Sequence, residues 1–323
     1  PNVHLKFAAQ KPYCSLPHTF RCSWQMAPVV KTLGVLVVLV AVLFKALAPA
    51  PLGEVVPVNL SGRTFVITGA TAGLGSWHAE QLAAWNASLV LPVRDVKRGE
   101  ALAERLSKTY PGAPRAVVVE MDLNSLDSVR GFAAKYKGPV DVLVHNAATL
   151  GSGQVRRTKD GFEECFQINY LSTFLLTSLL VDRIEQSSAG RVVHVSAKAH
   201  DWANISLDAM RSEKMLGPDF PDRQGMMGNL AGSYADSKLA QILFSSALNR
   251  RLKGNAVSLS LHPAITQTEL LRDVKSSAVF SFLQENVMMK VGQAVGFMQT
   301  KEDAPKTQIH VSTHPALQEA GGG

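Results

Sequence analysis

The sequence predicts a single α/β domain built on a doubly wound parallel sheet with helices on both faces. From Arg63 onward, short β-branched apolar runs alternate with amphipathic helical stretches, which is the pattern of a parallel sheet. The runs are apolar throughout, as expected for strands buried on both sides. The chain has 323 residues, of which 46% are hydrophobic and 18% charged, so it contains enough apolar material for one large core.

The expected elements follow one another without an internal repeat. Each strand is a short apolar run that ends at glycine or at polar residues, and each helix has one apolar face. Strands are predicted at 63–69, 87–93, 115–122, 140–148, 191–197 and 255–263. Helices are predicted at 76–85, 95–110, 125–136 and about 158–186, and a further helix carries Tyr234 and ends near Arg251.

The first 56 residues are predicted to be a leader, separate from a domain at 57–323. Residues 1–53 contain no Asp or Glu and carry five Lys or Arg, which leaves only +2 of the net +7 for the rest of the chain. The high charge is therefore no evidence for a nucleic-acid groove. The apolar segment at about 32–52 favours a membrane signal-anchor, although a cleaved signal with "ALA" at 46–48 is an alternative. A buried core helix is disfavoured because the segment has no polar face.

Cysteine usage excludes two classes of site. Cys14 and Cys22 lie in the leader, and only Cys165 lies in the body, so no disulfide framework is expected. No second Cys/His pair has the spacing of a metal site, so no metal is expected either.

The strongest ligand signal is "TGATAGLG" at 68–75, which follows the first strand and opens a helix. Glycines at this place let the backbone turn tightly and approach a pyrophosphate at a helix amino end, which predicts a Rossmann-type nucleotide site. At the end of the second strand, Arg94 favours a 2′-phosphate and therefore NADP over NAD, and Asp95 is the expected helix cap. The predicted cofactor contacts at the other strand ends and within the loop are Gly69, Ala72, Gly73, Leu74, Gly75, Asp122, Leu123, Asn146 and Ala147.

Tyr234 and Lys238, in "YADSK", lie four residues apart on one face of a predicted helix. Such a pair is common in helices, so by itself it indicates no function. Its meaning depends on the residues that the fold brings to it.

Together these segments resemble the short-chain dehydrogenase/reductase family. The match rests on "TGATAGLG", "HNAA" at 145–148, Asn169 in "FQINYLSTF", Ser196 and "YADSK", and it extends from about Ser61 to Gly322. Within the family, "RTKDGFEECFQINYLSTFLL" and "SKLAQILFSSALNRRL" are most similar to the retinol-dehydrogenase and WW-domain-oxidoreductase group. No WW module is recognisable in these residues.

The resemblance implies a catalytic role for four residues. Tyr234 is implied as the acid/base, and Lys238 as the group that lowers its pKa and binds the nicotinamide ribose. Ser196 is implied to hold the substrate carbonyl, and Asn169 to position a water in the proton relay. The chemistry is consistent, because a free phenol, with a pKa of about 10, needs a nearby cation to act as a base at neutral pH. Ile265 and Thr268 match the positions that hold the carboxamide and the phosphates.

Three positions depart from the family pattern. Ala264 and Pro305 stand where glycine is usual, and the chain ends in "AGGG" where a final strand would begin, so that strand is expected to be missing. Between Ser196 and Tyr234 lies an insertion with apolar side chains that either line a lipid-sized site or pack a long loop. Its apolar members include Trp202, Met215, Phe220, Met226 and Met227. Residues 276–292 are placed like a substrate lid, and a plain amphipathic helix is the alternative.

These expectations combine into one functional hypothesis and two alternatives. The hypothesis is a membrane-associated, NADP(H)-dependent oxidoreductase that interconverts a lipophilic alcohol and its aldehyde or ketone, located in the endoplasmic reticulum or another endomembrane. Import into an organelle and secretion stay open, a homodimer is compatible with the resemblance, and no nucleic-acid partner is expected. The alternatives are a light-dependent protochlorophyllide-type reductase and a non-catalytic NADP-binding scaffold.

Overall fold

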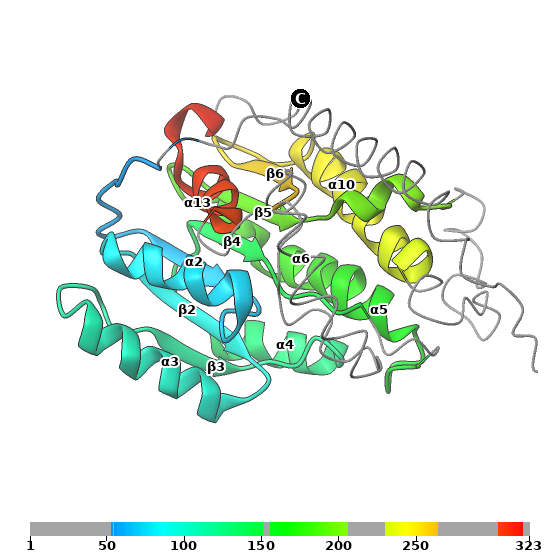
Figure 1. Ribbon diagram of the computed structural model, residues 1–323, viewed down its shortest axis with the longest axis horizontal. Helices are drawn as coiled ribbons and strands as arrows, with labels where there is room; N and C mark the ends of the chain where they lie inside the picture. The colour runs from blue at the N-terminus through cyan, green and yellow to red at the C-terminus, as the bar shows by residue number, and fades with distance from the viewer. Residues whose placement is uncertain (1–52, 54, 151–155, 206–229, 264–302, 319–323) are drawn as a thin grey trace, which may run out of the picture. The chain divides into compact units, whose positions relative to one another are not determined.

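The structure is a computed structural model that describes residues 53, 55–150, 156–205, 230–263 and 303–318 (Figure 1). All of these belong to one compact unit, Pro49–Gly323. The predicted anchor segment at 32–52 lies outside the described residues. Within the described ranges, no helix combines the length and apolarity needed to cross a bilayer.

Six parallel strands form the sheet, in the order β3-β2-β1-β4-β5-β6. Their bounds are β1 Thr64–Ile67, β2 Ser88–Val93, β3 Val117–Glu120, β4 Val142–His145, β5 Arg191–Val195 and β6 Val257–Leu261. The strand order reverses between β1 and β4, and in such sheets ligands bind in the crevice at that reversal, beyond the carboxyl ends of the strands. The predicted doubly wound parallel sheet is confirmed.

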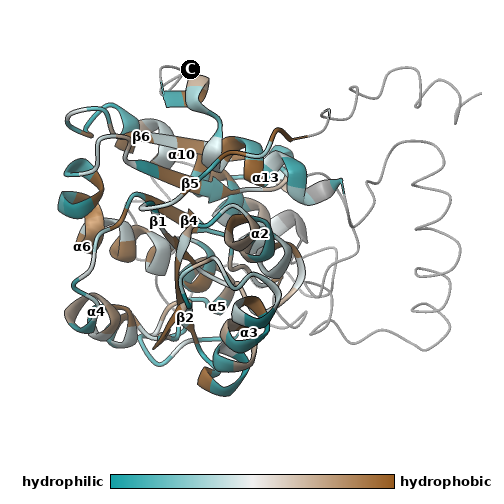
Figure 2. Cartoon of the chain, turned by 90° about the vertical axis from the view of Figure 1, so that its left-hand side faces the viewer, coloured by the Kyte–Doolittle hydropathy of each residue, from teal (hydrophilic) through white to brown (hydrophobic). Residues whose placement is uncertain are grey.

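Helices cover both faces of the sheet (Figure 1). One layer holds α2 (Gly73–Ala84), α3 (Val96–Thr109) and α13 (Ala304–Thr313), and the other holds α4 (Leu126–Lys135), α6 (Ser172–Glu185) and α10 (Ala235–Asn249). Successive strand residues face opposite layers: Phe65 belongs to the core under α2 and α3, and Val66 to the core under α4 and α6. Figure 2 shows these strands as an apolar band between the helices.

The long helix predicted at 158–186 begins later than expected. Residues 158–161 form a turn, Arg157 pairs with Glu163 in an isolated antiparallel bridge, and helix α5 (Glu164–Phe166) starts after them. The Glu163 carboxylate accepts hydrogen bonds from the backbone N–H groups of Cys165 and Phe166, and thereby caps the helix. A π-helical turn, η1 (Gln167–Leu171), then leads into α6.

Helix α13 is held by a buried arginine at the start of β5. Arg191 is 2% exposed. Its guanidinium donates to the carbonyls of Val311 (2.7 Å) and His314 (3.2 Å) at the carboxyl end of the helix. Pro305 lies in the first turn of α13, where the missing N–H costs little. Proline at position 305, where the family usually has glycine, is therefore compatible with the helix. In the described part of the chain the sheet ends at β6.

Candidate active site

The loop after β1 and the first turn of α2 each contain a glycine, Gly69 and Gly75, at which no side chain fits. Gly69 has φ +67°, and a Cβ there would lie 2.8 Å from the Ala147 Cα. A Cβ on Gly75 would overlap both the Gly69 carbonyl oxygen and the Asn146 Nδ2. The loop and the end of β4 therefore approach each other as closely as backbone atoms allow, which is why both positions require glycine.

The amino end of α2 is open to an anion. Ala72 at its cap supplies no side-chain hydrogen bond, whereas α3 is capped by Asp95 and α4 by Ser125. The first N–H groups of a helix and its dipole attract negative charge, and here no side chain of the cap competes for them. The glycine loop and this uncapped end fit a bound pyrophosphate.

Asn146 braces the loop from β4. Its Nδ2 donates to the carbonyls of Thr68 (3.0 Å) and Gly69 (3.2 Å), and its Oδ1 accepts from Gln308 Nε2 (3.4 Å). Gln308, fully buried on α13, also lies 2.7 Å from His78 Nδ1 on α2. Asn146 was predicted to contact the cofactor, and in the structure its side chain supports the loop. Gln308 was not predicted, since nothing near it in the sequence indicates the contact.

The ends of β2 and β3 carry the other predicted cofactor residues. Arg94 is exposed after β2, and Asp95 caps α3 by accepting from the Arg98 N–H (3.1 Å), as the sequence predicted. The Arg98 guanidinium lies 3.4 Å from the Thr71 carbonyl in the glycine loop. Arg98 was missed, although a second arginine one helical turn after Arg94 was a usable signal. At the end of β3, the Asp122 carboxylate accepts from the Asn124 N–H (2.9 Å).

Asn169 lies at the centre of a buried hydrogen-bond network in η1. Its Oδ1 accepts from the Thr149 N–H (2.8 Å), and its Nδ2 lies 3.0 Å from both the Thr149 carbonyl and the Ser237 Oγ. The Ser237 hydroxyl donates to the Tyr234 carbonyl (2.7 Å). The network therefore links the turn of Asn169 to the turn η3 (Leu230–Tyr234) that positions the tyrosine.

Ser196, Tyr234 and Lys238 lie together beyond the carboxyl end of β5. Tyr234 is 5% exposed and Lys238 2% exposed, and the Lys238 Nζ is 5.5 Å from the centroid of the Tyr234 ring. The Ser196 Oγ donates to the Lys238 carbonyl (2.9 Å). The Lys238 ammonium donates to the Val195 carbonyl (2.8 Å) and to Gln241 Oε1 (3.1 Å).

Burial dominates the pKa values of both Tyr234 and Lys238. Burial raises the pKa of the Tyr234 phenol well above its usual value, and the nearby Cys165 thiol raises it further. The Lys238 ammonium faces the ring and the Val195 carbonyl, and burial lowers its own pKa to about 8. The role of Lys238 in lowering the tyrosine pKa therefore stays a prediction. Burial favours the neutral form of the Tyr234 phenol.

The sequence of the body matches a known family. Residues 63–209 match the family model described as short chain dehydrogenase. Retinol dehydrogenase 11 of Homo sapiens is 32% identical over 273 residues, which cover 82% of this chain and 77% of the relative. The chain belongs to the short-chain dehydrogenase/reductase family. The WW domain-containing oxidoreductase of Gallus gallus is 32% identical over 272 residues, covering 82% of this chain and 61% of the relative.

Solved structures of short-chain dehydrogenases share the fold. One from Brucella melitensis has a TM-score of 0.60 at 19% identity and covers 83% of this chain and 95% of its own. Another, from Sphingobium yanoikuyae in complex with NADPH, has a TM-score of 0.54 at 22% identity, covering 77% of this chain and 84% of its own. This short-chain dehydrogenase/reductase is an oxidoreductase, and the family uses a nicotinamide cofactor.

Part of the predicted site of this short-chain dehydrogenase/reductase lies outside the described residues. That part comprises Ala264, Ile265, Thr268, the segment 276–292 and the insertion residues Met215, Phe220, Met226 and Met227. Trp202 is described, at the end of η2 (Lys198–Trp202), and is 54% exposed.

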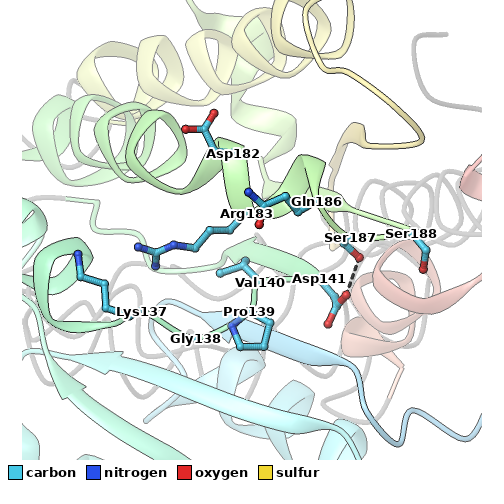
Figure 3. Close-up of a pocket in the computed structure, with 10 residues that line it drawn as sticks. All are labelled: Lys137, Gly138, Pro139, Val140, Asp141, Asp182, Arg183, Gln186, Ser187 and Ser188. Atoms are coloured by element: carbon cyan, nitrogen blue, oxygen red, sulfur yellow. Dashed lines mark hydrogen bonds between the residues drawn. The ribbon is translucent and has the colours of Figure 1, made fainter.

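A separate hollow of about 700 Å³ lies at the amino end of β4, away from the carboxyl ends that carry the site (Figure 3). Three of its polar side chains join elements of the fold. Asp141 accepts from the Thr64 N–H (2.7 Å) and from Ser187 Oγ (2.5 Å), and Arg183 donates to the Tyr136 carbonyl (2.6 Å). This hollow is therefore explained by the packing of β1, β4 and α6.

Proposed function

We propose that this chain is an NADP(H)-dependent oxidoreductase that interconverts a lipophilic alcohol and its aldehyde or ketone, with Tyr234 as the acid/base. The observation that carries the proposal is the buried group at the end of β5. There, Tyr234 lies against the Lys238 ammonium, Ser196 bonds the Lys238 backbone, and Asn169 is linked to the same turn through Ser237. The uncapped α2 amino end supports a cofactor on the neighbouring strands.

The residues around Tyr234 support its role in proton transfer. A bound nicotinamide cofactor would supply or accept the hydride at the carbinol carbon. In the reducing direction, the neutral Tyr234 hydroxyl donates a proton to the alkoxide oxygen, and the raised pKa keeps that proton available. The nearby Lys238 ammonium stabilises the phenolate that forms. Ser196 would stabilise the substrate oxygen by turning its hydroxyl away from the Lys238 carbonyl.

Two observations support a lipophilic substrate. Tyr234, whose hydroxyl is the proposed proton donor, belongs to an apolar cluster with Leu150, Cys165 and Ala199. The family relatives include retinol dehydrogenases 11 to 14, whose names specify an apolar alcohol. The apolar insertion and the segment 276–292 are proposed to complete the pocket. The segment at 32–52 is proposed to attach the protein to an endomembrane, and a homodimer stays a prediction.

Two arginines support NADP(H) as the cofactor. Arg94 is exposed directly after β2, and Arg98 reaches the glycine loop from the first turn of α3. A 2′-phosphate bound there would meet two guanidinium groups, whereas the 2′-hydroxyl of NAD would gain nothing from them. Two structural relatives were solved with NADPH, which is consistent with this choice.

The test is a turnover screen of the full chain with NADPH or NADH and a panel of apolar aldehydes and ketones, followed by nicotinamide absorbance. We expect oxidation of NADPH with at least one apolar carbonyl. Tyr234→Phe should lower kcat by about a thousandfold and leave NADPH affinity nearly unchanged, since the lost hydroxyl acts in proton transfer. Tight NADPH binding without turnover in either direction would favour the scaffold alternative. Pigment-dependent turnover that requires light would favour the protochlorophyllide-type alternative.

A further inference from the structure

Gln241 connects the lysine of the site to the turn that carries Asn169. It lies on α10, one turn after Lys238, and its side chain is fully buried. Its Oε1 accepts from the Lys238 Nζ (3.1 Å), and its Nε2 donates to the Asn169 backbone carbonyl (2.8 Å). One amide therefore spans the space between the ammonium and the π-helical turn η1.

The two partners fix the orientation of this amide. Lys238 has only donors to offer, and the Asn169 carbonyl is only an acceptor. Turning the amide over would place its NH₂ group against the ammonium and its carbonyl oxygen against the Asn169 oxygen. Both contacts would then be repulsive, and in a buried place a polar group without a hydrogen-bond partner destabilises the protein. The orientation follows from the chemistry of its neighbours.

The Asn169 carbonyl receives a second side chain as well. The Thr173 hydroxyl donates to the same oxygen (3.2 Å), and the turn is π-helical, so the Ser172 N–H bonds back to the Gln167 carbonyl five residues earlier. Such turns often occur where a helix serves a site. The lysine, the amide and the turn thus form one connected unit.

We propose that Gln241 is a positioning residue, which holds the Lys238 ammonium beside Tyr234 and ties it to the turn of Asn169. The inference rests on the proposed function and extends it to a residue that touches neither substrate nor cofactor. The Val195 carbonyl provides the other contact to the ammonium from β5, so two acceptors on different elements fix its place. Without Gln241, the ammonium would have one fixed acceptor and could rotate away from the tyrosine.

The position of the ammonium is coupled to its charge. The titratable groups that interact with it are Cys165 on α5 and His194 on β5, with Tyr234 beside it, and burial keeps all three neutral near pH 7. The charged groups of η2, which also packs against α10, are Lys198, His200 and Asp201. The Gln241 oxygen therefore favours the protonated form of Lys238 without help from a carboxylate. Its removal should lower the pKa of Lys238 below its present value of about 8.

The experiment compares Gln241→Met with Gln241→Glu in the full chain. The methionine removes both hydrogen bonds at similar volume, so we expect kcat to fall about tenfold to a hundredfold and the basic limb of the kcat profile to move to lower pH. The glutamate keeps an acceptor for Lys238, adds a negative charge and loses the donor to Asn169, so the basic limb should move to higher pH. Ser245→Ala, on the same helix, removes a buried bond to Ser258 of β6; it is the control and should leave the profile in place.

A second readout does not depend on turnover. The pKa of Lys238 is measured by ¹⁵Nζ-lysine NMR and assigned with Lys238→Met. Opposite shifts in the two Gln241 variants support the inference. Unchanged pH profiles and an unchanged Lys238 pKa in both variants would overturn it, even if kcat falls, because the role would then be structural only. If Gln241→Met does not fold, the upward shift in Gln241→Glu decides. If the wild-type protein turns over no carbonyl, the proposed function fails. The NMR shifts alone then show whether Gln241 positions the Lys238 ammonium.

Discussion

The two halves of the site are built in opposite ways. The glycine loop between β1 and α2 shapes its site with backbone groups and depends on the absence of side chains at Gly69 and Gly75. The catalytic half between η1, β5 and α10 depends on the presence of buried side chains that bond one another, among them Asn169, Ser237 and Gln241. Substitutions that add side-chain atoms should therefore impair the first half, and substitutions that remove hydrogen-bonding groups should impair the second.

The largest effect is expected from removing the centre of the side-chain network. Asn169→Leu removes three hydrogen bonds from the network, those to the Thr149 N–H, the Thr149 carbonyl and the Ser237 hydroxyl. The free energy of unfolding should fall by about 3 kcal/mol, and turnover should be lost with it. Urea unfolding measures the first quantity. A loss below about 1 kcal/mol would show that the network is not a structural unit.

An added methyl group tests the other half. Gly75→Ala places a Cβ against the Gly69 carbonyl and Asn146 Nδ2, so the loop must open and NADPH affinity should fall by about a hundredfold, or roughly 2–3 kcal/mol. Gly131→Ala on α4, where a Cβ meets nothing within 4 Å, is the matched control and should stabilise the helix slightly. Calorimetric titration with NADPH measures the difference. Equal affinities in the two variants would contradict the close approach.

The stability of the protein at low pH is a further test, because each half of the site contains buried neutral histidines. Burial lowers the pKa of His78 beside the loop and of His194 on β5 from 6.5 to about 3. The unfolded chain therefore takes up these protons first as the pH falls below 6.5. Stability is fully present above that pH and is lost progressively toward pH 3, by about 2 kcal/mol per histidine at pH 5.

The two histidines differ in their partners. Within the described residues neither ring nitrogen of His194 has a hydrogen-bond partner, whereas His78 Nδ1 meets Gln308. In His194→Leu, the free energy of unfolding should therefore fall less between pH 7.5 and pH 5.0, and its value at pH 7.5 should change little. His78→Leu should reduce this fall too but lower stability at pH 7.5. Denaturant unfolding at pH 5.0 and 7.5 measures both, and an unchanged decline in His194→Leu would refute its part in acid lability.

The smallest expected effect concerns cofactor choice at the rim of the loop. Arg98→Ala and Arg94→Ala should each weaken NADPH by about tenfold and NADH much less, because an exposed guanidinium loses only its contact with the 2′-phosphate. Arg130→Ala on α4, which removes an exposed charge paired with Asp127, controls for net charge. Equal losses for NADPH and NADH would contradict a 2′-phosphate contact.

The sequence predicted the first half better than the second. The glycines of 68–75 form one continuous motif between a strand and the next helix, so their spacing predicted the loop, although not its close approach to Asn146 and Ala147. The contacts of Gln241 and Gln308 could not be predicted in this way, since their partners lie 72 and 230 residues away. The start of helix α5 at Glu164 was missed for a similar reason. Its cap is a glutamate, which is not among the usual capping residues, so no common signal marked the boundary.

Helix α13 reaches back to the first loop of the fold through Gln308, and Arg191 fixes its carboxyl end to β5. From this arrangement we expect the cofactor site to form late in biosynthesis. The strands β1 to β6 emerge from the ribosome before residue 303, yet until then the brace on Asn146 and His78 is missing. A stalled nascent chain that ends before α13 should therefore retain NADPH poorly, and a chain that includes α13 should retain it well. Synthesis of α13 would then be the step that enables the enzyme to hold its cofactor.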